Sequence, residues 1–171
     1  MRQRLILALI ALAAAFLGLS GVAQPIVEAE YLGTYRWSLP GEDFGGFSGL
    51  EVTADGNSFV AITDRGSIVE GDFQRDGTEI IDVSVTNKLH PLKNPKGGPL
   101  SRFQVDAEGL AIGDDGRIYV SFEAIHRVWS YDNADSNAAG LPRHDDFKKM
   151  QNNSSLEALA IGPDGAIYTM P

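Results

Sequence analysis

The stretch DAEGLAIGDDGRIYVSFE, residues 106–123, has the pattern of a β-hairpin that begins and ends with carboxylates. Two β-rich runs flank the Asp-Gly pair at 115–116, and such a pair is a strong hairpin signal because the turn needs residues with positive φ. Residues two apart share one face of a strand. Glu108 is therefore predicted to point the same way as Leu110 and Ile112, toward packed protein, and a carboxylate in that position requires a physical reason.

The same pattern occurs three times along the chain. The other copies are SGLEVTADGNSFVAITD at 48–64 and EALAIGPDGAIYTMP at 157–171. Each copy has Ser or Glu, a small residue, Leu, any residue, and Val or Ile, followed by an Asp-Gly turn and a second β-rich run. Repeats of this period with several strands each are typical of propeller blades.

The repeats predict an all-β fold, a partial β-propeller of four-stranded antiparallel blades, with about two and a half blades in the chain. Apolar or small residues on both faces of the strand at 107–112 favour blades covered on both sides. The strands predicted for the three units are 47–53, 58–63, 67–73 and 79–85, then 109–113, 117–122 and 126–131 before a polar loop, then two strands in the last repeat. Residues 30–39 are expected to add an outer strand to the last blade.

The domain is expected to span 24–171 and to be incomplete at its C-terminus, because propellers need 4 to 8 blades. The alternative is a complete small β-domain whose repeats form a sandwich. In that case the outer face of the strands would usually be polar.

The first 23 residues have the order of a secretory signal peptide. Arg2 and Arg4 precede an uncharged apolar run at 5–17, and small residues follow at 21–23. The alternative is a single membrane anchor, because 5–22 is nearly long enough to span a bilayer. Cleavage predicts a secreted or periplasmic protein with no stable membrane insertion afterwards.

Charge and cysteine content exclude several classes of function. The chain has a net charge of −9 and no cysteine. Such acidity disfavours nucleic acid and anionic membranes as partners and favours binding of a cation. The alternative is that the acidic residues only keep the protein soluble. Without cysteine there are no disulfides and no thiolate metal sites.

Carboxylates are predicted to gather at one rim of the sheets. The first strand of each hairpin leaves this rim and the second returns to it, which brings together Glu108, Glu157, Glu123 and Asp64. Clustered, partly desolvated carboxylates cannot all stay ionised without a counter-charge, and Ca²⁺ accepts 6 to 8 oxygen ligands from such groups. These four residues are the predicted calcium ligands. The alternative is that they pair with arginines or face water in a wide channel.

Three cationic or titratable side chains are predicted on the same rim. Arg65, His126 and Arg127 lie at the turns between second and third strands and are candidates for binding a small anionic substrate. A lone histidine is more often structural. Phosphate loops, nucleophile elbows and His-Glu zinc motifs are absent from the sequence.

In order and spacing, the motifs of this chain resemble those of the phytase-like family, also described as having esterase-like activity of phytase. The motifs are GGFSGLEV, AITDRG, DAEGLAI, VSFE with HRVWSY, SLEALAI and DGAIYTMP, within about residues 30–171. The resemblance implies a secreted bacterial β-propeller that hydrolyses phosphoric or carboxylic esters with calcium assistance. Two alternatives remain: a non-catalytic propeller that binds a ligand or partner, and a metal-dependent hydrolase of the sugar-lactone type.

Overall fold

The computed structural model describes residues 29–41 and 44–171, and the chain divides into two compact units, 1–32 and 33–171. The predicted signal peptide at 1–23 lies outside the described residues. No helix in the described part of the chain is long and apolar enough to cross a membrane. The second unit consists of β-strands and one short 3₁₀ helix, η1 (Asp145–Lys149), and it carries the site residues considered below.

The first sheet has four antiparallel strands in sequential order, as the first repeat predicts. They are β1 (Phe47–Val52), β2 (Ser58–Thr63), β3 (Ser67–Asp76) and β4 (Glu79–Pro91). β3 and β4 extend beyond the predicted strands because their pairing continues through three register shifts.

The second sheet also has four antiparallel strands in sequential order: β5 (Ala107–Ile112), β6 (Ile118–Phe122), β7 (Arg127–Tyr131) and β8 (Ala139–Gly140). The sequence predicts a polar loop after β7, and it does not predict β8. Two residues are too few to show an alternating pattern, and only the pairing with β7 identifies them as a strand.

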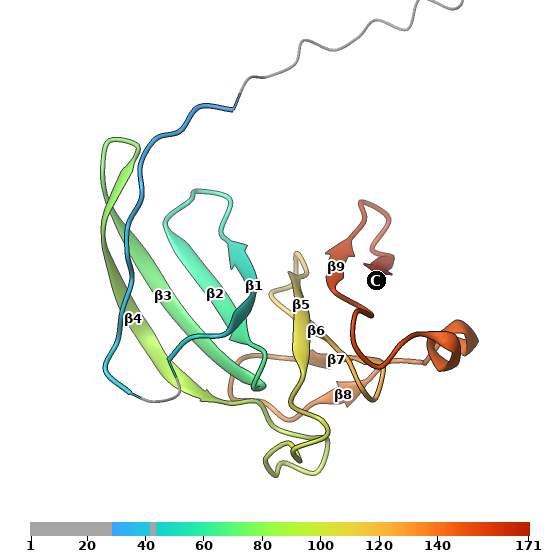
Figure 1. Ribbon diagram of the computed structural model, residues 1–171. Helices are drawn as coiled ribbons and strands as arrows, with labels where there is room; N and C mark the ends of the chain where they lie inside the picture. Colours follow the sequence, from blue (N-terminus) through green and yellow to red (C-terminus); the bar gives the residue numbers. More distant parts are fainter. Residues whose placement is uncertain (1–28, 42–43) are drawn as a thin grey trace, which may run out of the picture. The chain divides into compact units, whose positions relative to one another are not determined.

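The third sheet is the predicted hairpin of β9 (Ala158–Ile161) and β10 (Ile167–Met170). The first strands of the three sheets, β1, β5 and β9, lie side by side (Figure 1). The structure is thus all-β, built of antiparallel sheets whose first strands are neighbours, and these open sheets form a partial propeller-like arrangement.

Apolar side chains fill the space between successive sheets. Ile62 and Ile68 of the first sheet pack with Leu110 and Val120 of the second. A separate cluster joins the second sheet to the third, with Leu159 at its centre. Burial on both faces explains why the first strand of the second repeat shows no polar face.

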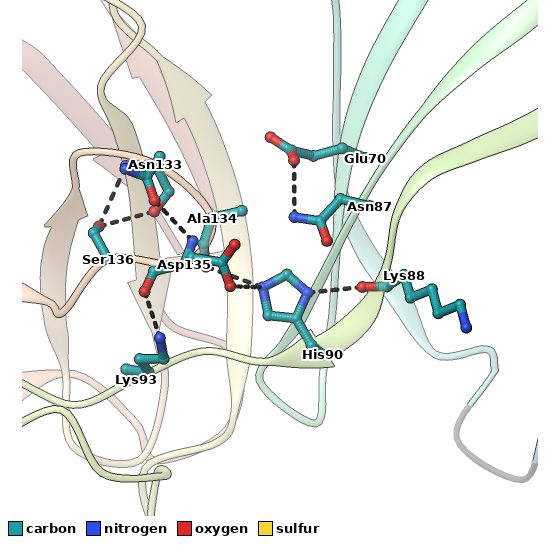
Figure 2. A network of polar contacts seen from close by, with 9 residues as sticks. All are labelled: Glu70, Asn87, Lys88, His90, Lys93, Asn133, Ala134, Asp135 and Ser136. Carbon is teal, nitrogen blue, oxygen red and sulfur yellow. Dashed lines mark hydrogen bonds and ion pairs between the residues drawn. The ribbon is translucent and has the colours of Figure 1, made fainter.

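A polar junction links the end of β4 to the loop after β7 (Figure 2). The ring of His90 lies between two carbonyl oxygens, with Nδ1 2.7 Å from that of Lys88 and Nε2 3.1 Å from that of Ala134. The ammonium of Lys93 donates to the carbonyl of Asp135. The first two sheets are therefore joined by hydrogen bonds at one side as well as by their apolar core.

The prediction of an outer strand at 30–39 is wrong, because these residues form no strand. Instead, Tyr35 and Trp37, which belong to the second unit, contact the first sheet. Trp37 stacks on Phe47, with ring centroids 5.2 Å apart, and meets Phe59 edge-on. The hydroxyl of Tyr35 donates to Asp82 at 3.0 Å.

Candidate functional site

Glu108 stands near the beginning of β5, where the β5–β6 ladder is irregular. The register shifts between Ala107 and Leu110, so Glu108 lies at this irregularity. The hydroxyl of Ser48 donates to the carbonyl of Ala107 at 2.6 Å and ties β1 to this point. Glu108 is half-buried, between a buried Ala107 and a buried Gly109.

Glu123 follows β6 and is only 2% exposed. Its Oε1 accepts hydrogen bonds from the backbone N–H groups of Ser154 and Ser155, both at 2.6 Å. Ser154 has a φ of 88°, and Leu156 also has a positive φ, of 50°. Two successive N–H groups in such a conformation form a concave site that binds an anion. One oxygen of Glu123 is thus committed to the loop before β9.

Glu157 directly precedes β9 and is exposed. The hydroxyl of Ser121, on β6, donates to the carbonyl of Leu156 at 2.6 Å and holds the adjacent backbone. The carboxyl groups of Glu157 and Glu123 lie near enough to each other for their charges to interact.

Asp64 follows β2 and is exposed, and its backbone N–H donates to the carbonyl of Gly46 at 2.8 Å. A β-carbon on Gly46 would overlap the carboxylate of Asp64, so a glycine is needed for this close approach. Arg65 lies 3.9 Å from Asp64, measured from Nε to Oδ1, and both side chains are about half exposed.

Asp106 also belongs to this group, although it was not among the predicted site residues. Its carbonyl accepts from the N–H of Glu123 at 2.9 Å, which places it at the same end of the hairpin. Partial burial raises its pKa, and the neighbouring Glu123 and Asp64 raise it further. The sequence could have identified Asp106 as a site residue, because it lies two residues before Glu108 and is expected on the same face of the strand.

These five carboxylates, named here the acidic rim, share one electrostatic environment. Burial raises the pKa of Glu108 to about 7, with additional contributions from the other four members, Glu157, Glu123, Asp106 and Asp64. Burial, the leading cause, and the neighbouring carboxyl group of Glu123 raise the pKa of Glu157. Within the described ranges, the ion pair of Asp64 with Arg65 is the one salt bridge to the rim. Pairing with arginines therefore leaves most of the rim charge uncompensated.

The rim carboxylates do not form a ready coordination site. In residues 29–41 and 44–171, no three acidic or histidine side chains come close enough together to hold one metal ion. Their oxygen atoms are nevertheless the type of ligand that Ca²⁺ prefers. The donor chemistry thus fits a hard cation, whereas the side-chain positions are those of a dispersed acidic surface.

Arg127, a predicted substrate-binding residue, is buried in the second sheet instead of facing a substrate. Its guanidinium lies over the rings of Phe122 and Trp129, 3.9 and 4.2 Å from their centroids. It donates to the carbonyls of Ile125 and Gln104. Burial lowers its pKa to about 10. These contacts assign Arg127 a structural role, and the substrate-binding prediction fails for it.

His126, the second of these residues, is also buried. Its Nδ1 lies 2.8 Å from the carbonyl of Phe147 and its Nε2 lies 2.9 Å from that of Gln151. Both ring nitrogens are therefore used to hold the segment around η1. The substrate-binding prediction fails for His126 as well, and Arg65 alone of the three is accessible.

Comparison with known proteins places these features in a family. The family model described as Phytase-like, esterase-like activity of phytase, matches residues 42–171. No curated protein matches the chain. The matched range contains all three repeats and the whole acidic rim, and it agrees with the motifs quoted from the sequence. The chain belongs to the Phytase-like family.

Proposed function

We propose that this protein is an exported hydrolase of phosphoric or carboxylic esters, assisted by calcium at the acidic rim. The observation that carries the proposal is the position of Glu108. It is a half-buried carboxylate, and its pKa is raised by burial and by the charge of the four other rim carboxylates. Family membership supports hydrolysis as the class of activity.

The rim residues have different roles in this proposal. Glu108, Glu157, Asp64 and Asp106 would hold the cation, after side-chain rotations that bring their oxygens together. Glu123 holds the loop before β9 through Oε1 and would contribute its second oxygen to the same cation. When bound, Ca²⁺ would polarise an ester oxygen and acidify water. The exposed guanidinium of Arg65 binds the anionic group of the substrate.

The acidity of the chain narrows the substrate to a small ester. A net charge of −9 disfavours extended polyanions such as nucleic acids, because a long anion meets repulsion along its whole length. A small anionic ester meets only the local charge of the site. The cation and Arg65 would offset the negative potential of the rim there.

Export accompanies this function, because calcium is abundant outside the cytoplasm. We propose cleavage after residue 23 and a periplasmic or secreted location. The reason is that charged, apolar and small residues follow one another in the sequence as they do in a signal peptide. Mass spectrometry of the protein recovered from the periplasm should find Gln24 at the N-terminus. Retention of an intact N-terminus in the membrane fraction would favour the anchor instead.

The calcium role is tested by thermal unfolding of the full chain with and without Ca²⁺. Calcium at about 100 times its Kd should raise Tm by about 5–10 °C, because it binds the folded state selectively. Glu108→Gln keeps the shape and removes the charge, so it should weaken this response. Glu51→Gln is the matched control, because Glu51 lines a separate pocket with Thr53 and Asp114. Hydrolysis of p-nitrophenyl phosphate and p-nitrophenyl acetate should follow the same pattern.

A ligand-binding module without catalysis is the second candidate. It is favoured by the dispersed position of the rim carboxylates in the described residues. If the wild type ignores calcium and Glu108→Gln is more stable without metal, the carboxylates are merely crowded and the binding module replaces the hydrolase. A lactone substrate tested in the same assay distinguishes the sugar-lactone alternative.

A further inference from the structure

The polar junction of Figure 2 places a titratable ring between the first two sheets. His90, on β4 of the first sheet, has its Nδ1 2.7 Å from the carbonyl oxygen of Lys88 on the same strand. Its Nε2 lies 3.1 Å from the carbonyl oxygen of Ala134, in the loop between β7 and β8 of the second sheet. The ring thus has a backbone acceptor at each of its two nitrogens, and the Nε2 contact crosses from one sheet to the other.

These two carbonyl acceptors set a condition on the protonation of the ring. A carbonyl oxygen only accepts, so each ring nitrogen needs a proton of its own to make a hydrogen bond here. Neutral imidazole carries one proton and has a lone pair on the other nitrogen. In either neutral tautomer of His90, that lone pair would face a carbonyl oxygen, at 2.7 Å or at 3.1 Å. Only the doubly protonated imidazolium can donate to both.

The acceptor on the second sheet is held in place by its own surroundings. Ala134 is only 3% exposed and packs in the core cluster that also contains Leu92. The N–H of Asp135 donates to Oδ1 of Asn133 at 3.0 Å, and the hydroxyl of Ser136 donates to the carbonyl of Asn133 at 2.8 Å. The carbonyl of Ala134 therefore cannot turn away from an unprotonated ring without disturbing this turn and the buried methyl group.

Charged groups from each neighbouring element surround the ring. Oδ1 of Asp135, in the β7–β8 loop, lies 3.5 Å from Nε2 of His90. The ammonium of Lys93, in the segment after β4, donates to the carbonyl of Asp135. Glu70 and Lys88 belong to the first sheet, and Figure 2 shows the side chain of Lys88 extending away from the ring. Within the described residues, the one ion pair of His90 is therefore with an anion, which favours imidazolium.

We propose that His90 is a proton-dependent latch between the first and second sheets. As imidazolium the ring joins the carbonyls of Lys88 and Ala134, and as neutral imidazole it joins only one of them. Histidine changes its charge near neutral pH. The latch is closed at low pH, and as the pH rises one hydrogen bond and the ion pair with Asp135 are lost. The apolar core between the sheets does not titrate, so the sheets stay packed but are held less firmly at this side.

Long-range ¹H–¹⁵N NMR of the full chain reads the protonation of its three histidines directly. A ring nitrogen that carries a proton and one that has a lone pair give different ¹⁵N signals. At pH 7 both ring nitrogens of His90 should carry a proton, and His90→Gln identifies these signals by their loss. His144 is the internal comparison, because its Nδ1 accepts the N–H of Asp146 at 3.3 Å and therefore needs a lone pair. A lone pair on either nitrogen of His90 at pH 7 would overturn the proposal.

Thermal unfolding measures what the second hydrogen bond contributes. His90→Gln is the matched variant, because an amide has N–H donors at every pH but carries no charge. It can replace the neutral ring but not imidazolium. The Tm of the wild type should exceed that of His90→Gln by about 3–6 °C at pH 5.5 and by less than about 1 °C at pH 9, since a bond from a charged donor is lost. The sign follows from linkage, because the folded protein binds the proton that closes the latch.

Two further variants separate the latch from other sources of pH dependence. Asp135→Asn removes the anion beside Nε2 and keeps the carbonyl of Ala134, so it should lower Tm at pH 5.5 and have little effect at pH 9. His144→Gln changes an exposed histidine, and its effect on Tm should differ by less than about 1 °C between the two pH values. The acidic rim is present in every one of these proteins, so its own pH dependence cancels in the differences from the wild type.

Two thermal results would also overturn the proposal. One is an equal Tm difference between the wild type and His90→Gln at both pH values. The other is a pH-dependent difference of the same size in His144→Gln, because any histidine would then produce it. The NMR measurement on the wild type decides the question even if His90→Gln does not fold. None of these experiments uses calcium or an ester, so their outcome leaves the proposed function untouched.

Discussion

Glu108 lies near the start and Glu123 just after the end of one hairpin, at the same rim, yet their surroundings give them different roles. Glu108 is half-buried beside other carboxylates, so its ionised form is disfavoured. Glu123 is fully buried, but two backbone N–H groups donate to one of its oxygens. Hydrogen bonds of this kind stabilise a carboxylate. The repeat pattern predicts that both residues lie at the rim. It does not predict that the loop before β9 donates hydrogen bonds to Glu123 and none to Glu108.

Glu123→Ala should lower the free energy of unfolding by about 2–3 kcal/mol, because it leaves two backbone donors beside a buried cavity without an acceptor. Glu123→Gln retains an amide oxygen that can accept both bonds, so its loss should be less than half of that. Urea unfolding of both variants, without metal, measures the difference. Equal losses in the two variants would show that the charge of Glu123, and not its acceptor oxygen, holds the loop.

At the level of elements, the three hairpins with Asp-Gly turns form through contacts between neighbouring residues, so the sequence predicts them well. In each repeat the aspartate of the Asp-Gly turn accepts a hydrogen bond from the N–H two residues later, always at 3.1 Å: Asp55 from Asn57, Asp115 from Arg117 and Asp164 from Ala166. Such a turn depends only on neighbouring residues. The sequence therefore predicts these three Asp-Gly hairpins correctly.

Elements that depend on distant partners were predicted less well. Residues 30–39 alternate like a strand, but a strand requires an edge to pair with, and sequence periodicity does not identify one. The segment packs through its aromatic side chains instead. The same limit applies to Arg127 and His126. The sequence predicts their positions near a turn, but it does not identify the distant carbonyls, or the ring on the adjacent strand, that bury them.

Trp37 makes the aromatic contacts of this segment with the first sheet. Trp37→Ala should destabilise the protein by about 2 kcal/mol, because it uncovers Phe59 and removes a half-buried ring. The indole N–H of Trp37 is buried without a hydrogen-bond partner. Trp37→Phe should therefore cost less than 1 kcal/mol, since it keeps the stacking and removes an unsatisfied donor. Chemical unfolding of both variants measures this, and equal losses would contradict the packing role.

At the level of the whole molecule, the acidic rim links folding to proton binding. The pKa of Glu108 is raised by burial and by its neighbours, and the pKa values of Asp106 and Glu157 are raised with burial as the leading cause. In the unfolded chain these groups return to ordinary values near 4. Between the ordinary values and about 7, the folded protein therefore holds more protons than the unfolded chain. Stability must then fall as the pH rises through this range.

The metal-free protein should accordingly be most stable near pH 4 and lose stability as the pH rises through about 7, and the decline should level off at about pH 8, where Glu108 is almost fully ionised. The shift at Asp55 has the opposite sign, because hydrogen bonds from Thr53 and Asn57 lower its pKa, and it acts only below this range. Glu108→Gln removes the largest contribution, so it should flatten the decline and be more stable than the wild type at pH 8. Glu79→Gln, an exposed position on β4, is the control and should keep the wild-type slope. Urea unfolding at pH 5, 6, 7 and 8 gives the comparison. An unchanged slope in Glu108→Gln would mean that the rim carboxylates ionise independently in the folded protein. In that case neither a cation nor a proton is needed to compensate their charge.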